Sequence, residues 1–385
     1  MAAYSYGFQT GQGFNPYLLR QIKDVVGLGN APSLKVSNLG FINLLNSQRK
    51  TLNLTVPNNN GAIQYVQVKY DQRYTHQMTQ TSDTCASGFQ NPYVEVSVPL
   101  NIYRQLPIYL ADELIAQYEF DANMTQAAGL PPTPVMGEVL NQIYAAANAI
   151  IEGINIDLQN QLVFGTNAST GSSAARTINF TQNTTNLPLN DGMTSILADT
   201  IINEFAPGKP QMFGNGYALD YFMQQRAKSD VFASSGLITK IEAGMVDFYY
   251  DQDSISILGA NEAALISPDS CQVVEYSRWE GARAGSRGNS HFGSIMLPMP
   301  GNSIAGGQPN FVPVKFDLQM NYINCVQDVQ AINDYYGNPI SNSFRGYQLI
   351  ISKYVGLFQV PTNAYRAGDN LYGANGVLRY TFTNI

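Results

Sequence analysis

The sequence predicts an α+β fold organised around one very long helix. Apolar residues recur at steps of three and four between Pro134 and Phe164, which is the period of an α-helix. Segments on both sides of that helix alternate apolar and polar residues, which is the period of a β-strand. Hydrophobic residues make up 44% of the 385 residues, so the chain can bury one large core or the cores of two ordinary domains.

The long helix is predicted from Pro134 to Phe164. Thr133 and Pro134 are typical of a helix start, and Gly165 is typical of a stop. The helix would be roughly 45 Å long, yet it is too polar to span a membrane. It is either an ordinary core helix or a spine on which a sheet lies and from which an inserted domain hangs. Its apolar stripe comprises Met136, Leu140, Ile143, Ala147, Ile150, Ile154, Leu158 and Leu162, and the residues away from it include Glu138, Asn141, Glu152, Asn155 and Asp157.

The composition favours a subunit of an assembly over a monomer. Charged residues make up only 13% of the chain, and polarity comes instead from Asn, Gln, Ser, Thr and 24 Tyr. A monomeric protein normally relies on surface charge for solubility. The centres of protein interfaces, by contrast, are depleted in charge and enriched in Tyr.

The same composition disfavours several classes of protein. The net charge of −7 argues against a protein that grips nucleic acid, because phosphate contacts need clustered Lys and Arg. Met1 to Gly13 has no basic start and no apolar run, so we expect no signal peptide, and no segment has the length of a transmembrane helix. Cys85, Cys271 and Cys325 are odd in number and far apart, which indicates reduced thiols in a cytoplasmic setting.

An arm and a hairpin precede the long helix. In the arm, Met1 to Gln48, a short helix is predicted at 15–26, and it must lie across the body of the protein or across a neighbour. Thr51 to Val56 and Ala62 to Tyr74 alternate like strands and are joined by an Asn-Gly turn, the strongest local hairpin signal. A two-stranded hairpin is marginal in isolation, so this one needs a surface to lie on.

The remaining elements alternate between strands and helices. A strand is expected at Val94 to Val98 and a helix from about Pro107 to Ala128. After the long helix, the pattern is typical of a second α/β unit inserted into the first. The later elements expected are strands at 177–180, 211–213, 312–324, 346–361 and 377–382, helices at 191–205 and 215–226, and a pair of strands within 247–258 broken at 251–254.

The motifs that could carry catalysis or bind a metal are incomplete. His76 and His291 each lack a second His, and we expect both to be ordinary exposed residues. The Gly214-Asn215-Gly216 stretch lacks the third glycine of a dinucleotide site, which favours a simple strand-to-helix turn.

Three aspartates, Asp247, Asp251 and Asp253, also lie close together in the sequence. Their spacing is too irregular for a calcium loop, and no glycine or glutamate follows at the required positions. A solvated turn is therefore expected there. No catalytic, metal-binding or cofactor-binding residue is assigned.

Two groups of charged residues are candidates for contacts. Arg278, Arg283 and Arg287 surround Trp279 in a Gly-rich stretch that predicts a flexible loop. These arginines are either solvated, or paired with another subunit, or in contact with phosphates of DNA. The second group lies on the hairpin, where Lys69, Asp71 and Arg73 share one face of a strand. Together with Asn59 and Asn60 of the turn, they are expected to contact a neighbouring subunit.

The order of these parts resembles the major capsid proteins of tailed bacteriophages, which have the Hong-Kong-97-type fold. The resemblance covers nearly the whole chain and rests on architecture, because this family has no invariant signature motif. It implies an N-terminal arm at 1–48 and an extended loop hairpin at 49–84. It also implies a peripheral domain at 85–190 and 343–385 with the spine helix at 134–164, and an inserted axial domain at 191–342. Strand 94–98 and strands near the C-terminus would complete the peripheral sheet.

The resemblance implies a structural protein and not an enzyme. Copies of the chain would form hexamers and pentamers of an icosahedral shell around double-stranded DNA, in a virion assembled in the bacterial host cytoplasm. The implied partners are other copies of the chain, scaffolding, portal and decoration proteins, and packaged DNA held without tight specific binding. No cofactor and no membrane is implied. Because the sequence lacks a long helical N-terminal segment, the scaffold is expected to be a separate protein.

Two other functions remain open. An encapsulin-like compartment shell would have the same fold and a different cargo. An enzyme could use carboxylates such as Asp112 and Glu113, although acidic residues are expected at the start of a helix for electrostatic reasons alone.

Overall fold

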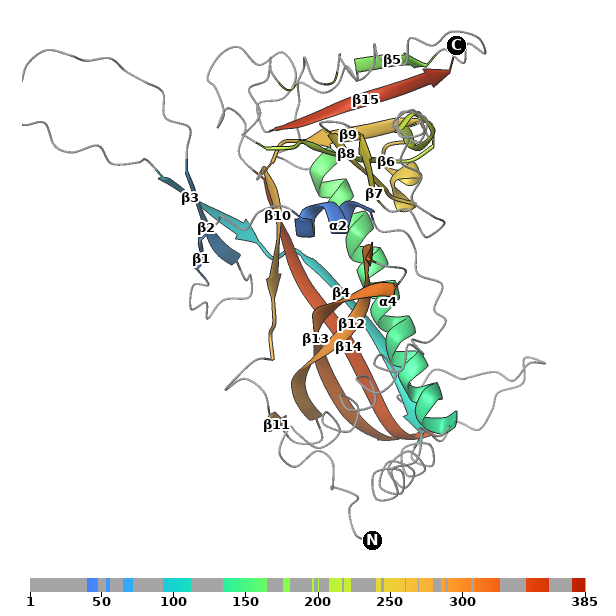
Figure 1. Ribbon diagram of the computed structural model, residues 1–385. Helices are drawn as coiled ribbons and strands as arrows, with labels where there is room; N and C mark the ends of the chain where they lie inside the picture. Colours follow the sequence, from blue (N-terminus) through green and yellow to red (C-terminus); the bar gives the residue numbers. More distant parts are fainter. Residues whose placement is uncertain are drawn as a thin grey trace, which may run out of the picture.

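The computed structural model is a mixed α/β fold in which few helices accompany many strands (Figure 1). Its described strands form one three-stranded sheet and two six-stranded sheets. The structure describes residues 40–47, 53–55, 65–71, 93–111, 134–164, 176–180, 196, 200, 208–216, 218–222, 240–243, 246–259, 261–268, 270–279, 285–287, 290–305, 308–325, 344–359 and 376–384.

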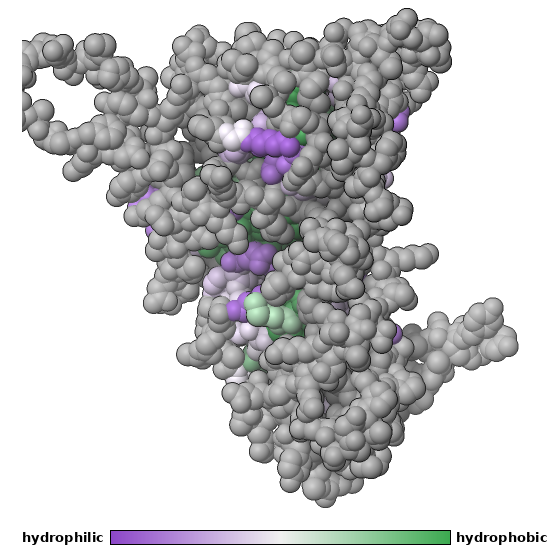
Figure 2. Space-filling view, in the orientation of Figure 1, coloured by the Kyte–Doolittle hydropathy of each residue, from purple (hydrophilic) through white to green (hydrophobic). Residues whose placement is uncertain are grey.

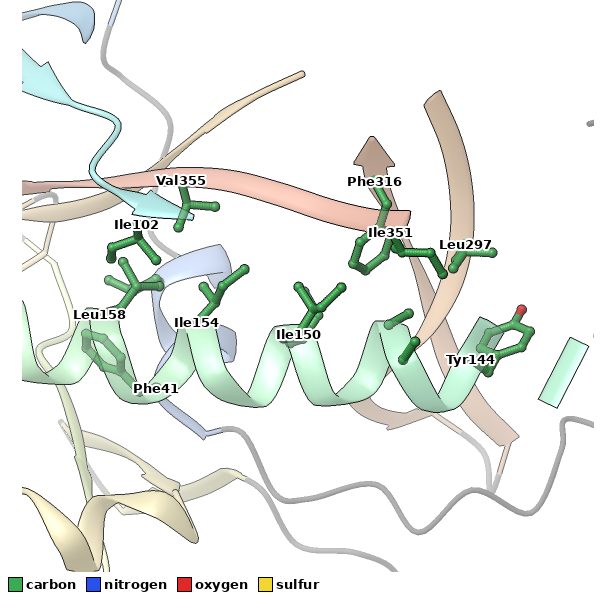
Figure 3. Close-up of a cluster of buried hydrophobic side chains, with 14 of the residues drawn as sticks. Phe41, Ile102, Tyr144, Ile150, Ile154, Leu158, Leu297, Phe316, Ile351 and Val355 are labelled. Carbon is green, nitrogen blue, oxygen red and sulfur yellow. The ribbon is translucent and has the colours of Figure 1, made fainter. Parts of the chain in front are cut away.

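The long helix predicted from the sequence is confirmed as α4 (Pro134–Phe164), with the predicted bounds. Its apolar stripe is buried in the largest core cluster of the described chain. In Figure 3, Ile150, Ile154 and Leu158 point from successive turns of α4 towards the strands that lie across it. Side chains of these strands, such as Ile351 and Val355, fill the space between helix and sheet.

The sheet that packs on α4 is built on β14 (Phe344–Gln359). One edge of β14 pairs with β4 (Ile102–Ala111), and the opposite edge pairs first with β13 (Gln308–Cys325) and then with β10 (Cys271–Tyr276), all antiparallel. Beyond β13 the sheet continues with β12 (Ser290–Ala305) and β11 (Gly285–Arg287). Figure 1 shows α4 running along the length of this sheet.

The second six-stranded sheet lies at one end of α4 (Figure 1). One of its faces contributes Phe213 and Tyr249 to the core that contains α4, and the other packs Met212 and Phe248 against residues 218–222, which are helical. Its strand order is β5 (Arg176–Phe180), β15 (Val377–Asn384), β9 (Glu262–Ile266), β6 (Gln211–Gly214), β8 (Val246–Tyr250) and β7 (Lys240–Ala243).

The predicted hairpin is confirmed in the third sheet, where β1 (Asn53–Thr55) pairs antiparallel with β2 (Tyr65–Asp71). A third strand of the same chain, β3 (Tyr93–Pro99), pairs with the other edge of β2. Val66 and Val68 of β2 form a small core with Val274 of β10 and Phe358 of β14. The base of the hairpin therefore lies on its own subunit, at the side of the body in Figure 1.

Part of the predicted arm also belongs to the body. Helix α2 (Gly40–Ser47) lies between α4 and the second six-stranded sheet (Figure 1), and its Phe41, Leu44 and Leu45 are buried in the shared core. The ring of Phe41 packs on that of Phe213, with a centroid separation of 4.5 Å. The short helix expected at 15–26 lies outside the described residues.

Strands β12 and β13 form a ribbon that extends beyond the rest of their sheet. β13 pairs with β14 only from Asp317 onward, whereas its pairing with β12 continues to Gln308. Among the described strands, residues 298–305 and 308–313 pair only with each other. This ribbon contains four prolines and no charged residue: Pro298 lies opposite Pro313, Pro300 opposite Phe311, and Pro309 opposite Ile304.

Two predicted elements are wrong. The helix expected from Pro107 is a strand as far as Ala111, because Ile102, Ile108 and Leu110 are buried in alternation with exposed residues. Pro107 is tolerated there because β4 lies at the edge of the sheet, where a missing N–H costs little. The second strand expected before residue 258 is instead the 3₁₀-helix η2 (Asp253–Ser256).

Several strands belong to a different sheet from the one that the expected domain boundaries would give them. β3 was expected in the peripheral sheet but pairs with the hairpin. β12 and β13, expected in the axial domain, belong to the sheet on α4, whereas β5 and β15 belong to the other six-stranded sheet. The expected turn at Gly214–Gly216 is confirmed, since β6 ends at Gly214, Gly216 has φ of 60°, and helical residues follow at 218–222.

We predict that Gly356→Ala destabilises the subunit. A Cβ atom at Gly356 would lie 2.5 Å from the carbonyl oxygen of Pro99, where β14 crosses β3. Separating the two strands should lower the free energy of unfolding by about 1–3 kcal/mol in urea. The control is Gly293→Ala on β12, where nothing lies within 4 Å of the added Cβ and the change should stay within about 1 kcal/mol. Equal stability of the two variants would contradict the close crossing.

Candidate contact surfaces and a buried carboxylate

The structure places part of the predicted hairpin contact. Lys69 and Asp71 lie two residues apart on β2, so they share one face of that strand. The register sets Lys69 opposite Glu95 of β3. Arg73, Asn59 and Asn60 are outside the described residues, so the contact of the whole group stays a prediction.

The predicted basic loop is only partly a loop. Arg287 lies on strand β11, opposite Ser290 of β12, so the expectation of a flexible loop is wrong at this position. Arg283 lies outside the described residues. Arg278 is exposed, yet its guanidinium lies 4.9 Å from the centre of the Trp279 ring and donates to the Tyr354 hydroxyl at 3.3 Å. Arg278 is therefore held against its own subunit.

A buried carboxylate fixes this region. Asp317 on β13 is 2% exposed and accepts hydrogen bonds from the Ser277 hydroxyl at 2.6 Å and from the Arg278 backbone N–H at 2.7 Å. The Trp279 backbone N–H donates to the same carboxylate. The chain after β10 is thereby tied to β13.

The sheet on α4 has a second face that turns away from the helix. Along β4, Ile108 and Leu110 face α4, so the alternate side chains face outward. We call this the neutral face. By register, its residues are Tyr103, Gln105, Pro107 and Tyr109 of β4, Gln348, Ile350, Ser352 and Tyr354 of β14, and Asp317, Gln319 and Asn321 of β13.

Polar side chains on the neutral face bond to one another along β13 and across to β14 and β4. Gln319 donates to Asn321 at 3.0 Å, Asn321 donates to Gln348 at 3.3 Å, and Gln348 donates to the Tyr109 hydroxyl at 3.1 Å. The rings of Tyr103 and Tyr354 stack with centroids 4.1 Å apart. These amides and hydroxyls supply hydrogen-bond partners to each other within the plane of the sheet.

The neutral face carries little charge. Asp317 is bound by backbone and hydroxyl donors, Lys315 of β13 follows the same alternation opposite Met296 of β12, and Arg278 lies at the border. Met296 of β12 and Tyr109 nevertheless expose 53% and 43% of their surface. Among the residues coloured in Figure 2, hydrophobic and hydrophilic side chains lie side by side. A tyrosine-bearing surface of low charge is suited to contact with protein.

The expected solvated turn at Asp251 is wrong, because Asp251 is completely buried. Its carboxylate accepts five N–H donors. Two come from its own turn, the backbone amides of Asp253 and Ser254, at 2.9 and 3.1 Å. One comes from α2, the Phe41 backbone amide, at 2.8 Å.

The other two donors to Asp251 come from α4. The side-chain amides of Asn155 and Gln159 donate at 3.0 and 2.9 Å, and both residues are 0% exposed. Placing Asn155 away from the buried stripe of the helix is thus wrong. The Asn155 carbonyl oxygen also accepts from the Ile42 backbone N–H of α2 at 3.3 Å. Asn155 and Asp251 together join three parts of the chain that lie far apart in the sequence.

Burial dominates the ionisation of this group. It raises the pKa of Asp251, and the hydrogen bonds from Phe41, Asn155, Gln159 and Asp253 oppose that rise. Burial also raises the pKa of Asp253 to about 6. The hydrogen bond from Asn155 opposes this second rise, and the carboxylates of Asp251 and Glu152 add to it.

The remaining residues considered from the sequence are histidines, cysteines and two carboxylates, and the described residues among them do not form a catalytic or metal-binding group. His291 lies on β12, while His76, Cys85, Asp112 and Glu113 are outside the described residues. Cys271 is fully buried as a free thiol, and burial raises its pKa to about 12. Within the described residues, no group of three or more His, Cys, Asp or Glu is arranged to hold a metal ion. Among the helices that the structure describes, none is long and apolar enough to cross a membrane.

We predict that Asp251→Asn destabilises the subunit although the side chain keeps its shape. The new NH₂ group would face N–H donors, which leaves buried groups without partners and should lower the free energy of unfolding by about 2–3 kcal/mol. Asp157→Asn is the matched control on α4, because it breaks an exposed bidentate pair with Arg104 and should cost less than about 1 kcal/mol. Urea titrations of the two variants compare them, and equal losses would contradict the role of Asp251.

No protein-family model and no curated protein matches the sequence. The solved structures that are similar to this chain are mostly those of phages and phage capsids. One from Microbacterium phage Oxtober96 has 12% identity and a TM-score of 0.38, and the match covers 94% of this chain and 98% of that one. The capsid of Myoviridae phage XM1 has 11% identity, a TM-score of 0.34 and coverages of 92% and 95%. A virus-like particle from Pyrococcus furiosus has 8% identity, a TM-score of 0.36 and coverages of 95% and 99%. All three TM-scores lie below 0.5, so the function has to be inferred from this chain's own surfaces.

Proposed function

We propose that this chain is a structural subunit that assembles with many copies of itself into a closed shell. The neutral face carries this proposal. Its amides and hydroxyls bond to one another. Another protein could therefore cover this face and leave few polar groups without hydrogen-bond partners. Its exposed tyrosines and its low content of charged residues are typical of an interface centre and unusual for a surface that faces water.

The finer proposal is the shell of a tailed bacteriophage, built from hexamers and pentamers in the bacterial host cytoplasm and found in the virion. A net charge of −7 suits a container for double-stranded DNA that does not grip its contents. Scaffolding, portal and decoration proteins would be further partners. No enzymatic step and no cofactor belong to this proposal.

The Hong-Kong-97-type parts are also part of the proposal, with sheet membership as described above. The extended loop would be the β1–β2 hairpin, seated on β3. The peripheral domain would be α4 with the sheet of β4 and β10–β14, and the axial domain would be the sheet of β5–β9 and β15. Helix α2 would be the end of the N-terminal arm that is fixed to the body.

Two further surfaces would contact neighbouring subunits. One is the hairpin with Lys69, Asp71, Arg73, Asn59 and Asn60. The other is the segment with Arg278, Arg283 and Arg287, which would meet either a neighbour or the DNA. Arg278 is the weaker candidate of its group for phosphate contact, because Trp279 and Tyr354 already hold its guanidinium.

We predict that the wild-type chain forms large particles and that Tyr109→Asp does not. A carboxylate at this half-exposed position would be taken out of water by a neighbouring subunit, which is costly without a partner for the charge. Light scattering and negative-stain microscopy at micromolar concentration measure assembly, and circular dichroism shows that the variant remains folded.

The matched control is Ile255→Asp, because Ile255 is 54% exposed and lies on η2, away from the neutral face. Particles formed by Tyr109→Asp as readily as by the wild type would remove the neutral face from the contact. A wild-type chain that stays a monomer of 42.2 kDa under all conditions would overturn the shell itself.

We also predict that reversing two hairpin charges, Asp71→Lys with Arg73→Glu, impairs assembly and leaves the subunit folded. Mixed charges on one strand face suit pairing with a neighbour, and each exposed pair contributes about 0.2–1 kcal/mol, repeated at every contact of a shell. Thermal stability of the particles and of the free subunit separates the two effects. Particles with wild-type heat resistance would show that these charges only face solvent, and a subunit that cannot fold would place them in its own core.

A further inference from the structure

Two strands share one edge of β14. Its residues 344–352 pair with β13, and its residues 354–359 pair with β10. The two pairings meet at Lys353, and we call this point the pairing boundary. Every residue of β14 offers the same backbone N–H and C=O groups, so backbone pairing alone does not decide where one strand ends and the other begins. Either strand could advance along β14 by displacing its neighbour.

Lys353 holds the pairing boundary on the face towards α4. Alternation places its side chain with Ile351 and Val355, which pack in the core around α4. It is only 4% exposed. Its ammonium donates to the backbone carbonyl of Lys315 on β13 at 3.0 Å and lies 2.9 Å from the Glu275 carboxylate of β10. One side chain of β14 therefore binds both competing strands.

Asp317 binds β10 and β13 together on the opposite face. It is the last residue of β13 that pairs with β14. Its carboxylate accepts from the Ser277 hydroxyl and from the backbone N–H groups of Arg278 and Trp279, which follow directly after β10. If β10 continued in register, Arg278 would take the place of Asp317 opposite Ser352. These hydrogen bonds would then be lost.

We propose that Lys353 and Asp317 form a two-sided stop that fixes the pairing boundary between β10 and β13. Burying an ion pair contributes little net stability, because both charges must be taken out of water. A shifted boundary, however, would leave a buried charge without its partners, which is costly. The stop therefore selects one arrangement of strands more than it stabilises the subunit.

The pairing boundary also determines where the β12–β13 ribbon leaves the sheet. β12 stays paired with β13 beyond the boundary, from Ile295 opposite Phe316 to Ala305 opposite Gln308. A shift of β13 along β14 would therefore move the root of the ribbon. The inference concerns the folded subunit and does not depend on the proposed function.

Lys353→Met separates strand selection from stability. Methionine keeps a long apolar side chain beside Phe316, whose ring centre lies 5.6 Å from the ammonium. The side chain of Glu275 is 48% exposed, so water can replace its lost partner. The urea midpoint of unfolding should therefore stay close to that of the wild type. Local opening at the pairing boundary should increase about tenfold or more, because hydrogen bonds of a charged group are lost.

The experiment is hydrogen exchange of the full-length protein, read by mass spectrometry with fragmentation that resolves single amides. The amides of Arg278 and Trp279 should exchange about tenfold faster in Lys353→Met than in the wild type, while those of α4 keep their rates. Both amides are bonded to Asp317 and not to Lys353, so their faster exchange reports the opening of the boundary and not a lost contact.

Arg104→Met is the control for loss of a nearby cation. Arg104 lies opposite Lys353 on β4 but pairs with Asp157 of α4, so its replacement should leave the exchange of Arg278 and Trp279 unchanged. Unchanged rates in Lys353→Met overturn the proposal, and so do equal effects of the two variants. Faster exchange throughout α4, a lowered urea midpoint or a Lys353→Met subunit that does not fold also overturns it, because each would assign the lysine to overall stability.

Discussion

The buried carboxylate of Asp251 is the contact on which the arrangement of the described parts depends. It receives N–H groups from α2, from α4 and from the turn after β8, so it fixes the relative position of a helix near the start of the chain, the central helix and one six-stranded sheet. Apolar packing could bring these parts together in several slightly different ways, because it has little directional preference. A fully buried anion has few acceptable arrangements of donors, and any displacement leaves it without partners. Apolar side chains pack around this fixed carboxylate, as the ring of Phe41 does against that of Phe213.

Polar groups have different roles around Asp251 and on the neutral face. Around Asp251 they are enclosed within the subunit and specify its internal geometry. On the neutral face they bond to each other in the plane of the sheet, so the sheet presents rings and amides with little free charge. A subunit with 13% charged residues has few ions with which to define contacts. Shape and matched hydrogen bonds are then the means left for choosing partners, and they respond less to salt than ion pairs do.

The long helix could be predicted with its bounds because its signal is local and repeated over 31 residues, between a proline at its start and a glycine after its end. The hairpin and the strands β13, β14 and β15 were predictable from alternation for the same reason. Strand β4 was not, because Pro107 and nearby acidic residues imitate a helix start. Sheet membership could not be predicted, since pairs such as Gly346 with Ala111 join distant segments. Asp251 was misassigned because its partners Phe41, Asn155 and Gln159 lie 92 to 210 residues away in sequence. The neutral face depends on register across β4, β14 and β13, which no single segment reveals.

The prolines of the β12–β13 ribbon are relevant to the aggregation of newly synthesised chains. A two-stranded ribbon beyond the edge of a sheet offers backbone N–H and C=O groups on which another copy could add a strand, and repeated addition leads to fibres. Proline has no N–H to donate, and in the register of the ribbon Pro298 lies opposite Pro313, Pro300 opposite Phe311 and Pro309 opposite Ile304. No charged side chain lies between residues 298 and 313 to repel a second ribbon. Within this segment, the missing N–H groups of the prolines are therefore what hinders the addition of a strand from another copy. If the chain assembles in many copies as proposed, this protection would act before any ordered contact has formed.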